Sequence, residues 1–401
     1  MSDKVIGIAG KNSIAINVLD YVKKRYPNYK ILGCVNKTDN LINSWQYSFG
    51  KYCIDNEVEI VKLEDLYSIP DLYLLSLEYD RLINTDRFTS KNLFNIHFSL
   101  LPAYKGMYTS ALPILHGAEY SGVTLHLIDN GIDTGDIIAH EKIAIDEHFT
   151  CRDLYLSYLC EGEKLVIANV DKLINNNYTI TKQPSLGSSY FSKRTIDYKN
   201  ILLNVNKTAC EIERQIRAYN FREYQLPVFL GFQIYKAVIM NSKSYSKPGT
   251  VLFEDTFSIK IASVDYDIEL RKDQLEELHS AAKSGDLGKI KQIHATGFDV
   301  KVKDKNGWDI LIIASYNGRF NVVEWIIESN LLNINTTNYN GTTAVMYAMT
   351  YAAQTKDKSI MNYLISKGAN LTLIDEKKLD IFHYANMYDI DIYYELNNIR
   401  K

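Results

Sequence analysis

The residues of this chain best suited to chemistry are an asparagine and a histidine two positions apart, Asn95 and His97. They end a predicted strand, so both side chains leave the same face of the sheet, at the edge where open α/β sheets bind ligands. Two polar residues that terminate a strand could explain the pair equally well. A third residue decides for a site: Asp133 lies in a glycine-bracketed turn that follows the next strand and can fold back beside His97. A histidine near a carboxylate can exchange protons near neutral pH.

Metal binding is the weaker reading of the same region. Five of the eight histidines fall between His97 and His148, but none has the His-x-x-His or His-Glu-x-x-His spacing that places ligands on one helix face. We therefore expect no metal.

Two motifs carry a resemblance to a known family. They are N-x-H-x-S-L-L-P, from Asn95 to Pro102, and D-x-G-x-D-T-G, from Asp129 to Gly135. With these motifs, residues 1–250 resemble the formyltransferases that use N10-formyltetrahydrofolate. The resemblance implies that Asn95, His97 and Asp133 are the catalytic residues. Asn95 and His97 would donate to the oxyanion of a tetrahedral intermediate, His97 would accept the amine proton, and Asp133 would orient His97.

The acceptor amine is narrowed by two further segments. The stretches LPAYKGMYTS at 101–110 and IRAYNFREY at 216–224 look most like sugar N-formyltransferases. The resemblance implies a dTDP-linked amino-dideoxyhexose as acceptor, used for bacterial surface polysaccharide (O-antigen), and favours dTDP-3-amino-3,6-dideoxyglucose or its epimer. Two alternatives stay open, a 4-amino sugar as acceptor and an ankyrin scaffold that carries an inactive transferase fold.

The resemblance also suggests binding residues, although a loop lysine or packed aromatics would look the same. Expected contacts to the dTDP-sugar are Ser99, Tyr104, Lys105, Met107, Tyr219, Asn220, Arg222 and Tyr224. Expected contacts to the folate are Ser76, Tyr79, Asp129, Gly131 and Asp136.

The elements that must position these residues follow an α/β pattern. We predict a Rossmann-like catalytic domain at 1–185, a small β-rich domain at 186–270, and an all-α ankyrin repeat stack at 271–401. Short apolar runs predict parallel strands at 4–9, 31–35, 59–61, 72–77 and 93–97, then antiparallel strands at 121–128 and 137–145. Helices are predicted at 13–26, 109–117, 152–176 and 207–218, and β-like runs at 229–240 and 257–264. The segment GIAG at 7–10 lacks the full dinucleotide motif.

The last third of the chain repeats itself. Ala281, Ala314, Ala348 and Ala385 are 33, 34 and 37 residues apart on one template that resembles the ankyrin repeat, in three to four copies. Aromatic residues lie in its turns, and packing between the repeats is one explanation for them. Our sharper hypothesis is a second nucleotide-sugar site at Trp308 and Tyr316; a protein ligand is the other expectation for such a stack.

Composition excludes several functional classes. The net charge is −3 with no Lys/Arg block, which argues against nucleic-acid binding, and no apolar run approaches the length of a membrane helix. Five scattered cysteines indicate buried free thiols rather than disulfides or zinc ligands. We expect a cytoplasmic protein, and family analogy suggests a homodimer.

Overall fold

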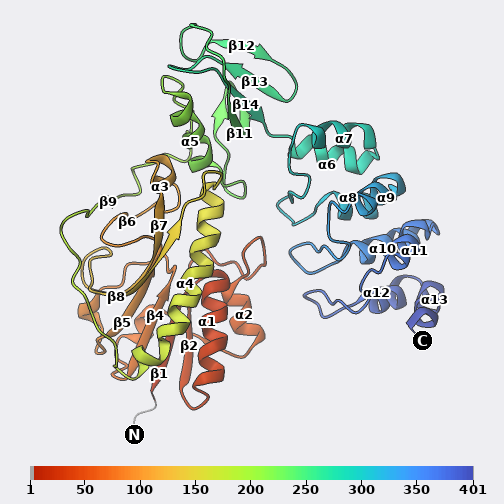
Figure 1. The fold of residues 1–401 in the computed structure, drawn as a ribbon. Coiled ribbons are helices and arrows are strands. Elements are labelled where there is room, and N and C mark those ends of the chain that lie inside the picture. Colours follow the sequence, from red (N-terminus) through yellow and green to blue (C-terminus); the bar gives the residue numbers. More distant parts are fainter. Residues whose placement is uncertain (1–3, 401) are drawn as a thin grey trace. The chain divides into compact units, whose positions relative to one another are not determined.

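The computed structural model of the chain describes residues 4–400 and divides it into two compact units, one built mainly from residues up to Asp273 and one from Gln274 onward. The first unit is built on a seven-stranded sheet in the order β3-β2-β1-β4-β5-β7-β8 (Figure 1). Its strands are β1 (Val5–Gly10), β2 (Lys30–Val35), β3 (Glu59–Ile60), β4 (Leu72–Leu77), β5 (Asn92–His97), β7 (Tyr120–Leu127) and β8 (Ile137–Ala144).

The first five strands in this order, from β3 through β2, β1 and β4 to β5, pair in parallel. Strands β7 and β8 pair antiparallel to their neighbours. This confirms the predicted parallel sheet with a late antiparallel addition. Six-residue runs such as β1 and β4 are buried on both faces because helices and loops cover both sides of the sheet. The carboxyl ends of β4 and β5 therefore meet at one edge.

Helices α1 (Asn12–Arg25) and α4 (Cys151–Ile174) lie side by side on one face of this sheet (Figure 1). Helix α4 begins with a capping box in which Thr150 and Asp153 bond each other's main-chain N–H. The shorter helical segments are α2 (Phe49–Asp55), η1 (Leu63–Leu66), η2 (Thr85–Arg87) and α3 (Leu112–Leu115). The prediction of a helix across 109–117 was too long, since the backbone turns left-handed at Tyr108 and Gly117 on either side of α3.

A second, five-stranded sheet follows in the order β10-β11-β14-β13-β12, packed against one helix. Its elements are α5 (Ala209–Tyr219), β10 (Val228–Phe229), β11 (Phe232–Ile239), β12 (Val251–Glu254), β13 (Ser258–Ile261) and β14 (Ile268–Lys272). Its core joins isoleucines of α5, such as Ile212, to those of the strands, such as Ile234 and Ile259. The run predicted as one strand at 229–240 is broken at Leu230 and Gly231, which both have positive φ and form a hairpin turn.

A two-stranded sheet links distant parts of the first unit. Strand β6 (Lys105–Gly106) pairs in parallel with β9 (Tyr190–Phe191). The loop that follows β5 is thereby joined to the segment that follows α4.

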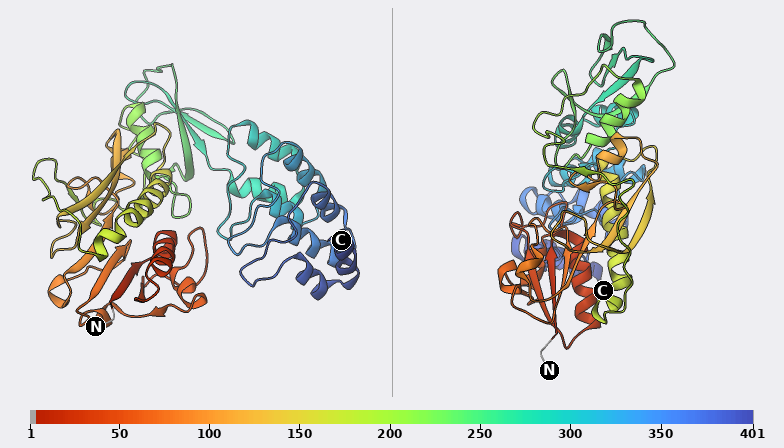
Figure 2. Two further views of the ribbon diagram at one scale, coloured as in Figure 1. Left: turned by 60° about the horizontal axis from the view of Figure 1, so that its bottom comes forward. Right: turned by 90° about the vertical axis from the view of Figure 1, so that its left-hand side faces the viewer.

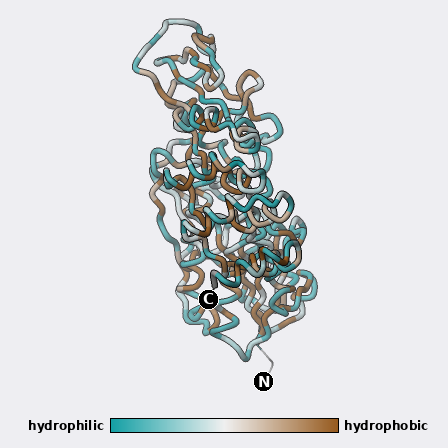
Figure 3. Tube along the Cα trace, turned by 90° about the vertical axis from the view of Figure 1, so that its right-hand side faces the viewer, coloured by the Kyte–Doolittle hydropathy of each residue, from teal (hydrophilic) through white to brown (hydrophobic). Residues whose placement is uncertain are grey.

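The second unit consists of helix pairs stacked one on the next (Figure 2). The pairs are α6 (Leu275–Ser284) with α7 (Leu287–Ala295), α8 (Ile310–Tyr316) with α9 (Phe320–Glu328), α10 (Ala344–Thr355) with α11 (Ser359–Ser366), and α12 (Ile381–Tyr388) with α13 (Ile390–Arg400). The four repeated alanines are all buried, where a small side chain lets neighbouring helices approach closely. Along the repeats, hydrophobic and hydrophilic residues alternate, as amphipathic helices require (Figure 3).

Two further observations bear on the sequence predictions. Within residues 4–400, no helix is both long enough and apolar enough to cross a membrane. Cys34, Cys53 and Cys151 are buried as expected, but Cys160 and Cys210 are exposed, because they lie on the outward faces of α4 and α5.

Candidate active site

The predicted catalytic residues meet at the carboxyl edge of the sheet. In the β5–β7 ladder Asn95 lies directly across from His126, and His97 lies across from Thr124. Opposed residues in an antiparallel pair project from the same face. The ladder therefore gathers Asn95, His97 and His126 on one side of the sheet, while the turn after β7 carries Asp133 back toward them.

His97 is buried and held by the loop that follows its own strand. Its Nε2 lies 2.9 Å from the carbonyl oxygen of Tyr104, and a carbonyl only accepts, so Nε2 carries the proton. The other ring nitrogen, Nδ1, faces Oδ1 of Asp133 at 3.5 Å. In the neutral ring Nδ1 thus has a free lone pair, and the Asp133 carboxylate stabilises the ring once that nitrogen takes up a proton.

His126 is a site residue that the sequence analysis missed. Its Nδ1 donates to the carbonyl oxygen of Leu127 at 2.7 Å, so its Nε2 is unprotonated and accepts from Nδ2 of Asn95 at 3.1 Å. Burial, together with the charge that the neighbouring His97 can carry, lowers the pKa of His126 to about 4. A neutral His126 therefore fixes which way the Asn95 amide points. Its signal in the sequence was its place in the alternating strand that precedes the Asp133 turn.

The segment 183–191 also reaches this site, although the sequence analysis placed only a domain boundary there, between residues 185 and 186. Nε2 of Gln183 donates to the carbonyl oxygens of Asp133 at 2.8 Å and of Gly135 at 2.7 Å. Ser189 Oγ accepts from the main-chain N–H of Tyr104 at 2.8 Å. One short segment thus contacts both the Asp133 turn and the loop that holds His97.

The predicted acceptor residues after β5 divide into two groups. Met107 is exposed, whereas Tyr104 and Lys105 are half-buried: the Tyr104 ring is stacked with His116 at 5.8 Å, and the Lys105 ammonium donates to Ser188 Oγ at 3.3 Å. Ser99 is different, since it is fully buried and its hydroxyl donates to the carbonyl oxygen of Ala103 at 2.7 Å. Its hydroxyl shapes the loop, so the structure does not present Ser99 to a substrate.

The predicted residues at 219–224 lie between α5 and the second sheet, and their polar groups are largely engaged there. Tyr219 ends α5, and the Asn220 amide donates to the carbonyl oxygen of Tyr235. Arg222 pairs with Asp273 at 2.6 Å. Tyr224 is 58% exposed, the largest exposed fraction among these four residues.

The predicted folate residues fall into two groups, Ser76 and Tyr79 at the end of β4 and Asp129, Gly131 and Asp136 in the turn between β7 and β8. Ser76 lies in register with Asn95 on the neighbouring strand. The Tyr79 hydroxyl accepts from the Cys34 thiol, and its ring packs against a buried cluster of residues from β1, β2 and β4.

Asp129, Gly131 and Asp136 shape the turn that contains Asp133. Oδ1 of Asp129 accepts from the Gly131 N–H at 3.0 Å and from the Thr134 hydroxyl at 2.7 Å, and the Asp136 carbonyl accepts from Leu127 N–H. A Cβ on Gly131 would lie only 1.9 Å from Thr134 Oγ1, so this tight turn requires glycine there.

Glu78 is a second polar residue at this edge that the sequence analysis passed over. It directly follows β4 with φ +60°, a backbone conformation that glutamate rarely adopts. Its Oε2 accepts from the buried Asn12 amide at 2.6 Å and from the Tyr155 hydroxyl at 2.7 Å. A carboxylate held by α1 and α4 therefore stands one strand away from His97.

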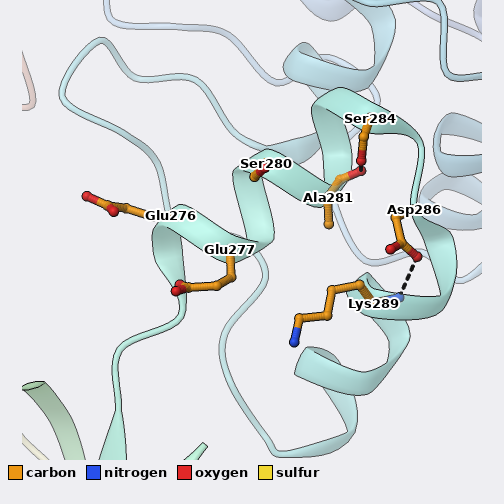
Figure 4. Close-up of a pocket in the computed structure, with 7 residues that line it drawn as sticks. All are labelled: Glu276, Glu277, Ser280, Ala281, Ser284, Asp286 and Lys289. Atoms are coloured by element: carbon orange, nitrogen blue, oxygen red, sulfur yellow. Dashed lines mark hydrogen bonds between the residues drawn. The ribbon is translucent and has the colours of Figure 1, made fainter. Parts of the chain in front are cut away.

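In the repeats, the predicted aromatic residues do come together. The Trp308 ring lies 5.4 Å from that of Tyr316 and 4.6 Å from that of Tyr347, and Tyr316 is 40% exposed. A separate open depression lies on the first repeat between α6 and α7, lined by charged and small residues such as Glu277, Asp286 and Lys289 (Figure 4). Within residues 4–400, no three His, Cys, Asp or Glu side chains are grouped to hold a metal ion.

Comparison with known proteins finds a related family for each of the two units. Residues 68–170 match the formyl transferase family, and residues 278–375 match ankyrin repeats in three copies. The crystal structure of WlaRD, a sugar 3N-formyl transferase with dTDP and 5-N-formyl-THF present, is 43% identical, with a TM-score of 0.62 over 68% of this chain and 98% of that chain. An N-formyltransferase from Helicobacter canadensis, in complex with folinic acid and dTDP-3-aminofucose, is 41% identical, with a TM-score of 0.61 over 67% of this chain and 99% of that one.

Methionyl-tRNA formyltransferases are more distant relatives. Those of Clostridium novyi and Coxiella burnetii (strain CbuK_Q154) are 28% and 31% identical over 50% and 45% of this chain. The chain spans only 65% and 58% of their length.

Proposed function

The chain belongs to the family of sugar N-formyltransferases, and on this premise we propose that it transfers a formyl group from N10-formyltetrahydrofolate to the amino group of a dTDP-linked amino-dideoxyhexose. The observation that carries the proposal is the convergence of Asn95, His97 and Asp133 at the carboxyl edge of the sheet, with His97 Nδ1 3.5 Å from Asp133 Oδ1. The family's motifs place these residue types there, and the fold gives each a defined orientation.

The proposed mechanism gives each of these residues a part in the reaction. The acceptor amine attacks the formyl carbon, and the new C–N bond leaves negative charge on the formyl oxygen. The Asn95 amide, oriented by His126, has one N–H left to donate to that oxygen. His97 Nδ1 takes the proton that the amine loses and returns it to N10 of the folate as the C–N10 bond breaks, while Asp133 stabilises the charged ring in between.

The acceptor is best placed among 3-amino sugars. Two relatives above 40% identity are a sugar 3N-formyl transferase and an enzyme complexed with dTDP-3-aminofucose. Methionyl-tRNA is the weaker candidate, because those relatives match only about half of this chain, and because a net charge of −3 without a Lys/Arg block argues against RNA binding. We therefore propose dTDP-3-amino-3,6-dideoxyglucose or its epimer as acceptor, and surface polysaccharide as the destination.

One assay tests this proposal. The purified chain with N10-formyltetrahydrofolate should turn over a dTDP-3-amino-3,6-dideoxyhexose faster than a dTDP-4-amino sugar, and should leave methionyl-tRNA unformylated. His97→Asn and Asp133→Asn should each lower kcat by about 10²–10⁴-fold, because proton transfer in the transition state contributes that much. Turnover near wild type in both variants would refute the catalytic assignment, and no turnover of any acceptor would favour the inactive-scaffold alternative.

For the repeats we propose a second site for the nucleotide part of the sugar. The aromatic cluster of Trp308, Tyr316 and Tyr347 supports it, because a pyrimidine base can stack on such rings. Calorimetry on the full chain and its Trp308→Ala variant tests this idea, as argued below.

A further inference from the structure

Gln183 lies just past the point where the chain returns to the catalytic sheet. Thr181 and Ile137 exchange two main-chain hydrogen bonds, each 2.8 Å long, which fixes the backbone two residues before Gln183 beside the start of β8. From there the Gln183 side chain reaches the turn that precedes β8. Its Nε2 donates both hydrogens, one to the Asp133 carbonyl and one to the Gly135 carbonyl.

The direction of this amide is set by chemistry. Two carbonyl oxygens need donors, and an amide oxygen in the same place would repel them, so Nε2 must face the turn. The Gln183 Oε1 atom is buried and has no hydrogen-bond partner. The amide group of Gln183 is therefore held by its two donated hydrogen bonds alone. Its contribution to the site is to fix the positions of the two carbonyl groups that accept them.

The backbone of Asp133 has a conformation that is uncommon for residues other than glycine. Its φ is +55°, in the left-handed region, where Asp and Asn are the residues found most often after glycine. The turn packs closely against β7 at Gly135, where an added Cβ would lie only 1.7 Å from the Leu127 carbonyl oxygen. The turn therefore has no room to move toward β7. Carboxylate Oδ2 accepts from the Gly106 N–H at 2.8 Å, and the other oxygen, Oδ1, faces His97. Any rotation of the Asp133 backbone would carry Oδ1 away from the His97 ring.

We propose that Gln183 is a positioning residue for the reaction: by bridging the carbonyls of Asp133 and Gly135 it aims the Asp133 carboxylate at Nδ1 of His97. Neither the family motifs nor the predicted site includes it. The inference rests on the proposed function, since it concerns the same proton-accepting pair. It implies that loss of the bridge acts through Asp133 and lowers the rate of the chemical step more than substrate binding.

The test is a double-mutant cycle in the full chain. Gln183→Met keeps the length of the side chain and removes the donors. We expect kcat to fall about tenfold or more, with KM for both substrates within about twofold, because an interaction made mainly in the transition state is lost. In the Asp133→Asn background the same change should alter kcat by less than about twofold, because residues that act through one another are not additive.

A matched control separates positioning from stability. Gln215 in α5 also donates to two main-chain carbonyls, those of Asn204 at 3.1 Å and Glu211 at 3.4 Å, within the core of the second sheet. Gln215→Met should lower the melting temperature but leave kcat unchanged. A kcat in Gln183→Met within twofold of wild type, or a full multiplicative loss on top of Asp133→Asn, would overturn the inference.

A measurement that needs no turnover tests the positioning role separately from the proposed function. In the substrate-free protein, the ¹⁵N resonance of His97 Nδ1 should shift in the same direction in Gln183→Met and in Asp133→Asn. An unchanged resonance in Gln183→Met would contradict the positioning role, even if the chain formylated none of the tested sugars. If the resonance shifts as expected but no acceptor sugar is formylated, only the proposed function is contradicted.

Discussion

At the scale of single residues, the site is organised by hydrogen bonds that decide which ring nitrogen carries a proton. His97 donates through Nε2 to the Tyr104 carbonyl and presents Nδ1 to Asp133. His126 has the opposite tautomer, with Nδ1 donating to the Leu127 carbonyl and Nε2 accepting from Asn95. The two histidines are therefore not interchangeable: one is arranged to take up a proton, and the other to stay neutral.

The role of His126 leads to a prediction about rate. In His126→Phe the Asn95 amide loses the acceptor that orients it, so we expect kcat to fall about 10–100-fold, less than the loss of an oxyanion donor itself. His140→Phe is the matched control, because His140 is exposed on β8, and it should retain wild-type kcat. Steady-state kinetics with saturating folate would measure both, and equal rates in the two variants would contradict the role.

The same residue predicts how stability depends on pH. Burial lowers the pKa of His126 from 6.5 to about 4, so the unfolded chain binds its proton first as the pH falls. The stability that His126 contributes is thus present above pH 6.5 and is lost between about pH 6.5 and pH 4. Between pH 7 and pH 5, urea unfolding of the wild type should lose roughly 2 kcal/mol more than that of His126→Phe.

At the scale of elements, the site depends on short segments rather than on long helices. The β6–β9 pairing joins the loop after β5 to the segment after α4, and Gly106 sits at its centre. Gly106 has φ +86°, its N–H donates to Asp133, and an added Cβ would lie 2.3 Å from the Phe191 carbonyl. Gly106 thus provides a left-handed turn, a donor to Asp133 and room for the Phe191 carbonyl, and only a residue without a side chain can provide all three.

This element-scale argument yields a paired prediction. Gly106→Ala should separate β6 from β9, displace the N–H that holds Asp133, and lower kcat at least tenfold. Gly187→Ala is the control, since Gly187 also has positive φ, +79°, but nothing lies within 4 Å of an added Cβ. It should cost only about 1 kcal/mol of stability through backbone strain, with kcat unchanged. Kinetics and thermal unfolding of both variants would show whether close packing or strain matters.

At the scale of the whole molecule, the chain combines a transferase fold with a repeat stack of four helix pairs. Each unit has its own buried core: the repeats bury their alanines and isoleucines, and the transferase buries its parallel strands. An enzyme that handles a nucleotide sugar could use the aromatic rings of the repeats to hold a second molecule of the same ligand.

Calorimetry on the full chain tests that second site. Titration with the dTDP-amino sugar should give two molecules bound per wild-type chain and one per Trp308→Ala chain. Trp325→Ala is the matched control, because Trp325 lies on α9, where its ring contacts His294, and it should retain both sites. Equal binding in wild type and Trp308→Ala, with unchanged kinetics, would rule the site out.

The sequence by itself determined the α/β order of the first unit and the period of the repeats, and it singled out Asn95, His97 and Asp133 as the proposed catalytic residues. These depend on local hydrophobic patterns and on motifs that are contiguous in the chain. The ligand roles expected for Tyr79 and Ser99 rest on the family resemblance alone, and in the structure the hydroxyls of both residues form hydrogen bonds within the protein.

Only the tertiary structure revealed the parts played by His126, Gln183 and Gly106. Each acts across a separation that no local pattern records: His126 contacts Asn95 from 31 positions away, and Gln183 contacts Asp133 from 50. A tautomer, and the direction of a carboxylate, are set by which acceptor the fold brings within hydrogen-bond distance. That distance is a property of the folded sheet and its loops, and residue types along the chain do not specify it.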